Sequence, residues 1–337
     1  MALRALTCPS CGAPLPPNAR RAVVVCPYCK ASVTDEGAVV FAAGFRQALV
    51  DLDKSAPQGE RRVRVCGLPY RVIGRIAQGE STDVFLAERA HPITERVILK
   101  ALRAAADKDL LDREWEALAA LHASDEQGSA EFARRLPAPV ARGRIEGGGE
   151  RFAQMMRATS GFIDTFEDVG RAHPEGVDGR HAAWMWRRIL ELLGWVHRCG
   201  WAHGAILPAH LVVHAHDHGV MLVGWSCATR LGARAPLPVV NEAHREIYPE
   251  ALLRGAPPSA ATDIAMSARC IARVLGGSPA RLPTSVPEPL RSLVARHASA
   301  DDGRTLDAWD ILRDVAAAAR AAYGAPRYHR LSMPGWD

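Results

Sequence analysis

Residues 195–228 decide the fold of this chain. They read WVHRCGWAHGAILPAHLVVHAHDHGVMLVGWSCA. The pattern predicts the end of a helix, a compact polar loop, a strand over Leu211–Val213, a turn and a strand over Val220–Val223. The histidines of the turn, at 214, 216 and 218, are interpreted as an exposed polar turn, in preference to a second metal site.

The residues after this segment predict a mainly helical region. Two helices are also expected on the N-terminal side of the segment: a short one over Phe162–Val169 and a long amphipathic one over Arg180–Arg198 that leads into it. An irregular, proline-containing stretch leads to Tyr248-Pro-Glu250, and further helices are expected over Asp263–Leu275 and Leu306–Tyr323.

The residues before it predict a sheet with one helix. Asp107–His122 has the periodicity of an amphipathic helix. Five strands are expected around that helix, over Tyr70–Ile76, Val84–Glu88, Arg96–Leu102, Val140–Ile145 and Arg151–Met156.

The order of these landmarks, from about Val65 to Ala322, resembles the eukaryotic-type protein kinases. The family's His-Arg-Asp falls on His203-Gly-Ala205, its Lys-Pro-x-Asn on Leu207-Pro-Ala-His210, and its Asp-Phe-Gly on Gly224-Trp-Ser226. The resemblance implies an α+β, bilobal fold, with a five-stranded N-lobe carrying one helix and a mainly helical C-lobe.

The catalytic groups of that family are missing at these positions. Kinases position a substrate hydroxyl with an Asp, hold magnesium with an Asn and a second Asp, and place a Lys beside the phosphate. The corresponding residues here are Ala205, His210, Gly224 and Leu207. Ala and Gly offer no side-chain oxygen, and imidazole is a poor ligand for a hard cation. The resemblance therefore implies a degenerate kinase, a pseudokinase.

Part of a nucleotide site is retained. Of the three glycines of the kinase phosphate loop, only Gly79 survives, because Ala77 and Thr82 replace the others. Lys100 matches the kinase lysine, and Glu114 its glutamate partner, with Glu116 as the rival if the helix is rotated. We interpret the pair as structural, in preference to a residual contact with ATP or another nucleotide.

The residues that the resemblance assigns to architecture are kept. They are His203, Glu250, Asp263 and Arg304, which is expected to pair with Glu250. Loss of the catalytic set beside retention of this structural set favours a functional pseudokinase over a chance match.

Four cysteines near the N-terminus predict a metal site. Cys8 and Cys11 form one Cys-x-x-Cys pair, and Cys26 and Cys29 form a second. Two such pairs supply four thiolates for a tetrahedral zinc ion, as in a zinc ribbon, and Arg20–Val25 is expected to form a short strand between them. A rubredoxin-like iron site and a redox pair are the weaker alternatives. About forty residues bury too little surface to fold alone, so the metal is expected to stabilise the module.

Composition limits the classes of function and the cellular location that fit this chain. A net charge of +5, from 42 basic and 37 acidic residues, does not by itself indicate a nucleic-acid-binding protein. No apolar run is long enough to span a membrane and no signal peptide is recognised, so we expect a cytoplasmic location. Frequent Ala and Arg point to a GC-rich bacterial genome.

The sequence is expected to divide into five parts. They are a zinc ribbon (1–37), a helical linker (38–62) with a helix over 38–54, the N-lobe (63–157), the C-lobe (158–325) and a tail (326–337).

Three hypotheses about function follow. The first is a zinc-ribbon pseudokinase that acts as a scaffold or regulatory adaptor for a protein partner in a larger assembly and binds a nucleotide weakly, without magnesium. The second is an active atypical phosphotransferase or nucleotidyl transferase, with Glu80, Asp83 or Asp217 as relocated acids. The third is a nucleic-acid-binding protein that acts through the ribbon and the basic residues Arg20, Arg21 and Lys30, and it is less favoured.

Overall fold

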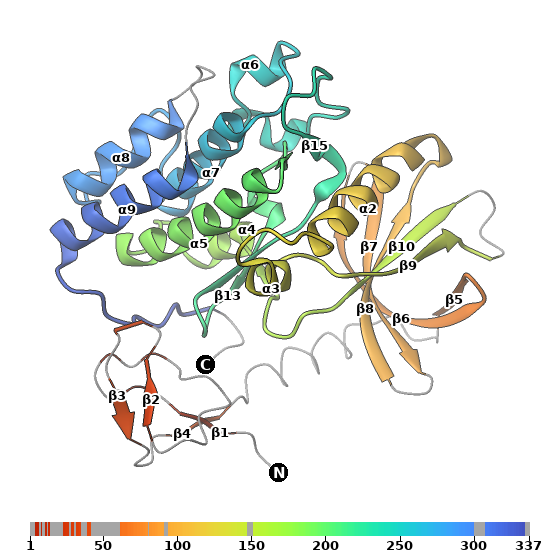
Figure 1. Ribbon diagram of the computed structural model, residues 1–337, viewed down its shortest axis with the longest axis horizontal. Coiled ribbons are helices and arrows are strands. Elements are labelled where there is room, and N and C mark those ends of the chain that lie inside the picture. Colours follow the sequence, from red (N-terminus) through yellow and green to blue (C-terminus); the bar gives the residue numbers. More distant parts are fainter. Residues whose placement is uncertain are drawn as a thin grey trace.

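The chain forms two lobes with a small cysteine-containing module beside them (Figure 1). The computed structural model describes residues 4–6, 8, 11, 13, 23–26, 28–29, 32–34, 39–41, 61–79, 81–90, 94–146, 151–299 and 307–333. In the described residues, no helix is long and apolar enough to cross a lipid bilayer.

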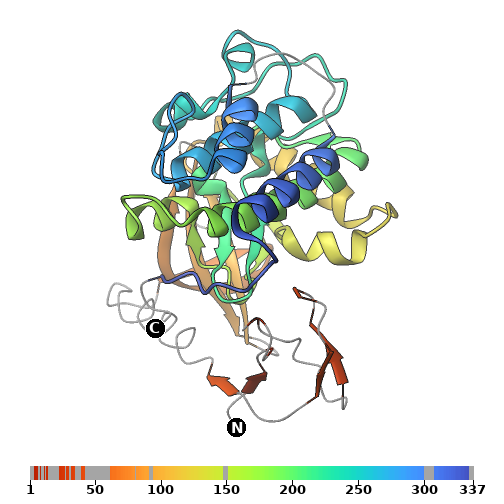
Figure 2. The ribbon, with the colours of Figure 1, turned by 90° about the vertical axis from the view of Figure 1, so that its left-hand side faces the viewer.

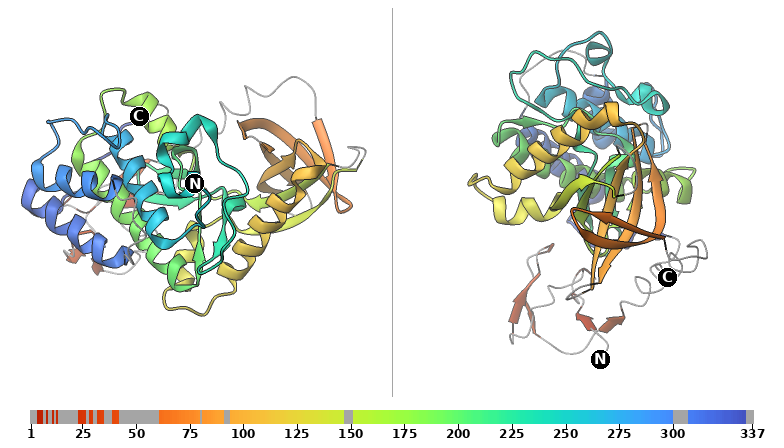
Figure 3. Two further views of the ribbon diagram at one scale, coloured as in Figure 1. Left: turned by 90° about the horizontal axis from the view of Figure 1, so that it is seen from above. Right: turned by 90° about the vertical axis from the view of Figure 1, so that its right-hand side faces the viewer.

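The N-lobe is built on a curled antiparallel sheet, visible in the right-hand view of Figure 3. Its six strands lie in the order β5 (Arg61–Val65), β6 (Leu68–Gln78), β7 (Thr82–Ala90), β8 (Thr94–Leu102), β10 (Phe152–Arg157) and β9 (Pro139–Arg144). An isolated bridge between Val65 and Ile145 brings the two ends of the sheet together. The sheet therefore encloses its own small core, which includes Tyr70, Leu99 and Met155.

The prediction of five strands was wrong by one, because β5 is an additional strand. It joins β6 through Cys66 and Gly67, whose φ angles are 52° and 73°. Positive φ at both residues is typical of the tight turns whose twist matches that of a hairpin. A cysteine at the first of these positions gives a weak turn signal, so no strand was predicted before Tyr70.

Helix α2 (Lys108–His122) lies against the sheet and reaches the C-lobe. Its buried residues Ala117, Leu118 and Leu121 belong to the same apolar cluster as the C-lobe core. The single N-lobe helix that was predicted is therefore the element that joins the cores of the two lobes.

The C-lobe is mainly helical and packs around α5. Its helices are α4 (Phe166–Ala172), α5 (Gly179–Arg198), α6 (Glu250–Leu253), α7 (Ala260–Val274), α8 (Glu288–Ala298) and α9 (Ala308–Tyr323). Its strands are β11 (Asp164–Thr165), β13 (Leu211–His214) and β14 (Gly219–Leu222) in one sheet, and β12 (Trp201–Ala202) with β15 (Thr229–Arg230) in another. Short helical turns complete the body: η1 (Ala105–Asp107), α3 (Ser129–Phe132), η2 (Ala133–Arg135), η3 (Pro208–His210), η4 (Trp225–Cys227) and η5 (Glu242–Ile247).

Two helices begin three or more residues away from the predicted start. Helix α4 begins at Phe166 and not at Phe162, because Thr165 caps it: the Thr165 side chain accepts from the Asp168 amide, and the Asp168 carboxylate accepts from the Thr165 amide. Helix α7 begins three residues earlier than Asp263, since Ser259 forms the same kind of capping box.

The N-terminal module contains two short antiparallel strand pairs. Strand β1 (Arg4–Leu6) pairs with β4 (Val39–Phe41), and β2 (Val23–Val25) pairs with β3 (Ser32–Thr34). The predicted helix over 38–54, and with it the helical linker 38–62, is wrong at β4, because short apolar runs fit a strand as well as a helix. Residues 42–60 of that prediction lie outside the described residues.

Candidate functional site

The loop between β12 and β13 is held in place by a buried aspartate from α7. Asp263 accepts hydrogen bonds from the backbone amides of His203 and Gly204, both at 2.8 Å, and its Oδ2 lies 3.1 Å from Nε2 of His197. Its side chain is fully buried. Asp263, which the resemblance assigned to architecture, thus anchors the backbone of this loop.

His203 is a fixed, neutral packing residue. Its Nε2 donates to the Val223 carbonyl at 3.1 Å, and its Nδ1 accepts from the Ala205 amide at 3.2 Å. Burial lowers its pKa to about 3, so the ring is uncharged at neutral pH. The ring meets Trp225 edge-on, with 4.5 Å between centroids.

Ala205 and Leu207 are parts of the C-lobe core. Their exposed fractions are 2% and 1%, and both belong to the main apolar cluster. In the family that the sequence resembles, these two positions carry the acid that contacts the substrate hydroxyl and the lysine beside the phosphate. Here they are occupied by buried hydrocarbon, which cannot accept a proton or neutralise a phosphate.

The ring of His210 occupies the space beside Gly224. A Cβ atom added to Gly224 would lie 2.5 Å from both Cδ2 and Nε2 of His210, and Gly224 has a φ of +79°. The Nδ1 atom of His210 donates to the Ala205 carbonyl at 2.8 Å, which orients the ring. Burial lowers the pKa of His210 and keeps it neutral. The two positions that would hold metal ions in a kinase therefore pack against each other.

This contact predicts a non-additive effect of restoring the kinase residues. Gly224→Asp is expected to lower the free energy of unfolding by about 1–3 kcal/mol, because the new side chain meets the imidazole. In the His210→Asn background the same change should be less destabilising, with a coupling of about 0.5–3 kcal/mol between the two positions. Urea unfolding of the four proteins measures the coupling, and strictly additive effects would show that the ring does not block position 224.

Glu114 lies at the centre of a buried hydrogen-bond network. The Nζ atom of Lys100 is 2.5 Å from its Oε2, and the exposed fractions of the two side chains are 14% and 2%. Nε2 of the buried Gln154 donates to the same oxygen, and the Trp225 amide donates to Oε1 at 3.2 Å. The predicted Lys100–Glu114 pair is present, and Glu116, the rival partner, is exposed.

Gly79 is part of a tight hairpin turn between β6 and β7. Its amide donates to the Thr82 carbonyl at 2.8 Å, and its own carbonyl accepts from Arg103 at 3.3 Å. Ala77 is paired with Val84 in the sheet, so it contributes no free backbone to the turn.

The relocated acids do not assemble into a metal site in the part of the chain that the structure describes. Asp83 lies 3.8 Å from Arg75 in the N-lobe sheet, and Asp217 contacts His214 and His216 at the tip of the β13–β14 hairpin. Glu80 lies outside the described residues. So does Arg304, the predicted partner of Glu250.

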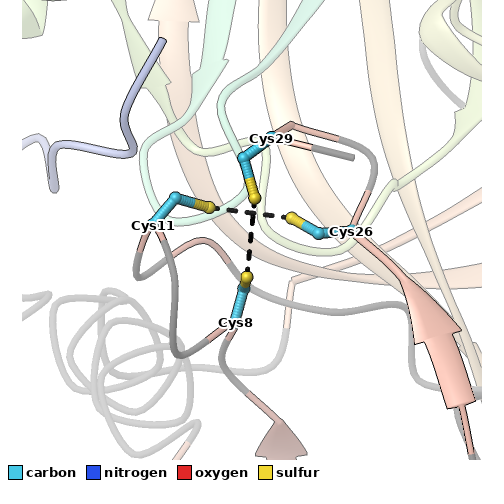
Figure 4. A group of neighbouring side chains, drawn as sticks. All are labelled: Cys8, Cys11, Cys26 and Cys29. Carbon is cyan, nitrogen blue, oxygen red and sulfur yellow. Dashed lines mark hydrogen bonds between the residues drawn. The ribbon is translucent and has the colours of Figure 1, made fainter. Parts of the chain in front are cut away.

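The four cysteines converge on one point, as Figure 4 shows. The Sγ atoms of Cys8 and Cys29 are 3.7 Å apart, as are those of Cys11 and Cys26, and all four lie within 4.8 Å of one another. A tetrahedral zinc ion with Zn–S bonds of about 2.3 Å places its sulfurs about 3.8 Å apart, whereas a disulfide needs about 2.05 Å. The site could therefore hold a metal ion such as zinc, and in the described residues it is the one group of three or more ligands so placed.

Metal binding also explains how four thiolates could share this site. Burial and the neighbouring thiols raise the pKa of Cys11 to about 12. A bound cation reverses this effect, because it stabilises the ionised sulfurs.

Comparison with known proteins identifies the fold. No model of a known protein family matches the chain, and neither does any curated protein. A solved structure of a rhoptry kinase from Toxoplasma gondii superposes with a TM-score of 0.58 at 16% sequence identity, covering 80% of this chain and 89% of that one. The chain thus has a bilobal, protein-kinase-like fold.

Sequence reasoning missed two members of the Glu114 network, Gln154 and Trp225. A signal for Gln154 was available, because a buried polar residue in the otherwise apolar strand Phe152–Met156 requires a partner. The role of the Trp225 amide had no such signal, since a backbone donor does not show in the residue type.

Proposed function

We propose that this protein is a catalytically inactive pseudokinase that acts as a scaffold or regulatory adaptor for a protein partner. The observation that carries the proposal is the contact between His210 and Gly224. Phosphoryl transfer depends on charge neutralisation by metal ions held at these two positions. An imidazole packed against a glycine supplies no oxygen ligand to such an ion.

The buried state of Ala205 and Leu207 supports the same conclusion. Both are apolar residues of the core, and introducing a charged group there would require burial of an isolated charge. A rotation of neighbouring side chains could therefore not supply the acid and the lysine that a kinase carries at these two positions.

Nucleotide binding, in this proposal, is weak and independent of magnesium. Lys100 and Glu114 keep the ion pair that positions the lysine in kinases, whereas the Gly79 amide, the kind of donor that binds a phosphate, is engaged by the Thr82 carbonyl. The Glu114 carboxylate accepts from Lys100, Gln154 and the Trp225 amide, which fits a structural role in which the pair joins α2 to the sheet.

The four-cysteine module, in this proposal, is a zinc ribbon. The sulfur spacing fits a tetrahedral thiolate site, and the strand pairs β1–β4 and β2–β3 are too short to be stable without a metal.

A phosphotransfer assay tests the proposed inactivity. The protein is incubated with radiolabelled ATP and magnesium or manganese, alone and with a general protein substrate, beside an active kinase as positive control. We expect no incorporation above that of the Lys100→Ala variant. Magnesium-dependent incorporation that Lys100→Ala abolishes would show an active enzyme.

A further inference from the structure

The N-terminal module that contains the four cysteines, called the metal module below, contacts the C-lobe through Tyr28, which lies between Cys26 and Cys29. The Tyr28 ring meets the ring of His218 edge-on, with 6.0 Å between centroids, and Arg188 lies over it at 6.0 Å. Its hydroxyl donates to the Asp217 carbonyl. A residue of one cysteine pair is thus packed on the tip of the β13–β14 hairpin and on α5.

The other cysteine pair contacts the C-terminal segment. The amide of Tyr328 donates to the Cys11 carbonyl at 3.1 Å, and the Tyr328 hydroxyl donates to the His216 carbonyl at 2.8 Å. The Tyr328 ring also packs against the apolar cluster formed by the cysteines. One tail residue therefore joins the metal module to the hairpin.

These contacts cover most of the hairpin tip, which corrects the prediction of an exposed polar turn: His214 and His216 are half-buried, and only Asp217 stays exposed. His218 has an exposed fraction of 3%. Its ring lies between Trp184, at 4.2 Å and nearly parallel, and Tyr328, at 4.6 Å. Its φ of 52° is unusual for a residue other than glycine, and such backbone persists where its surroundings hold it.

The tail itself is anchored along the C-lobe. Leu331 and Met333 are buried, and Nε2 of His173 lies 2.8 Å from the Ser332 carbonyl. The His329 carbonyl lies 2.7 Å from Nε2 of His218. In Figures 1 and 2 the tail leaves α9 and runs along the C-lobe toward the metal module.

We infer that the docking partner of the metal module is the protein's own C-lobe, through a metal-dependent clasp. The clasp consists of the metal module, the hairpin tip 214–218 and the tail 324–333. Cys11 and Tyr28 belong to the segments that wrap the ion, and so small a module keeps its shape only with the metal bound. Loss of the metal then releases Tyr328 and His218. This inference rests on the proposed zinc site but goes beyond the proposed pseudokinase role, because it holds whether or not the protein transfers phosphate.

Metal binding and the docking of Tyr328 are thermodynamically linked, so the clasp can be tested by changing either one and measuring the other. If the metal stabilises the docking of Tyr328, then Tyr328 must strengthen metal binding by the same factor. Tyr328 is not a ligand, so a mutation there removes the contact and leaves the four thiols intact.

Zinc affinity of the full chain is measured by competition with a chromophoric chelator. We expect Tyr328→Ala to weaken zinc binding by about 5-fold or more. Tyr323→Ala, at the end of α9 and outside the clasp, is the matched control and should leave the affinity unchanged. An unchanged affinity in Tyr328→Ala would overturn the inference.

Hydrogen–deuterium exchange of the full-length protein gives the reverse measurement. After zinc is removed by chelation, we expect amides of 324–333 and 214–219 to exchange about tenfold faster or more, while those of α5 keep their protection. The Tyr328 amide reports directly, because its acceptor is the Cys11 carbonyl. Exchange of the tail that is the same with and without zinc would overturn the clasp, even if the module itself loses structure.

Discussion

Replacing Glu114 by alanine is expected to lower the free energy of unfolding by about 3–5 kcal/mol. The substitution removes one partner of a buried ion pair and leaves the other uncompensated. It also removes the hydrogen-bond acceptor of the Gln154 side-chain amide and of the Trp225 backbone amide, which both donate to this carboxylate. An unsatisfied buried donor adds a desolvation penalty of its own.

A matched control lies on the same helix. Glu116 is exposed, so Glu116→Ala should change the free energy of unfolding by less than about 0.5 kcal/mol. Urea denaturation of both variants makes the comparison. Equal, small effects of the two substitutions would mean that the Glu114 network does not stabilise the fold.

Replacing one of the four cysteines is expected to remove the metal and unfold its module. Structural zinc sites in small peptides bind with apparent free energies of about 10–16 kcal/mol, which is the energy that folds them. Cys26→Ser should therefore reduce bound zinc from one ion per chain to none, and the amides of β2 and β3 should lose protection from exchange.

The kinase-like body should stay folded in that variant. Its two apolar clusters are distinct from the one around the cysteines, so its core does not depend on the metal. Cys199→Ser, at a half-buried cysteine outside the site, is the control and should keep the zinc. A fully zinc-loaded Cys26→Ser protein would contradict the four-cysteine assignment.

Much of the fold could be predicted because its signals are local. The amphipathic period of α2 and α5 and the order of the kinase-like motifs placed both lobes. The errors lie where short segments are ambiguous: Val39–Phe41 forms a strand where a helix was expected, and the strand β5 was not predicted.

The site could be predicted in its residues but not in its contacts. The resemblance places His210 and Gly224 at the positions of metal ligands. Only the structure shows that one fills the space that a side chain on the other would need. Similarly, no pattern links Tyr28 to His218 or to Tyr328, because these contacts join segments far apart in the chain and rest on ring packing.

The most direct test of the central claim is the melting temperature with ATP, measured in EDTA and again with excess magnesium. A ligand that binds only the folded state raises its stability. Because the residues at 210 and 224 offer no oxygen to a divalent ion, magnesium should add nothing to any shift that ATP produces alone. A rise of about 5 °C or more that appears only when magnesium is present would contradict the account.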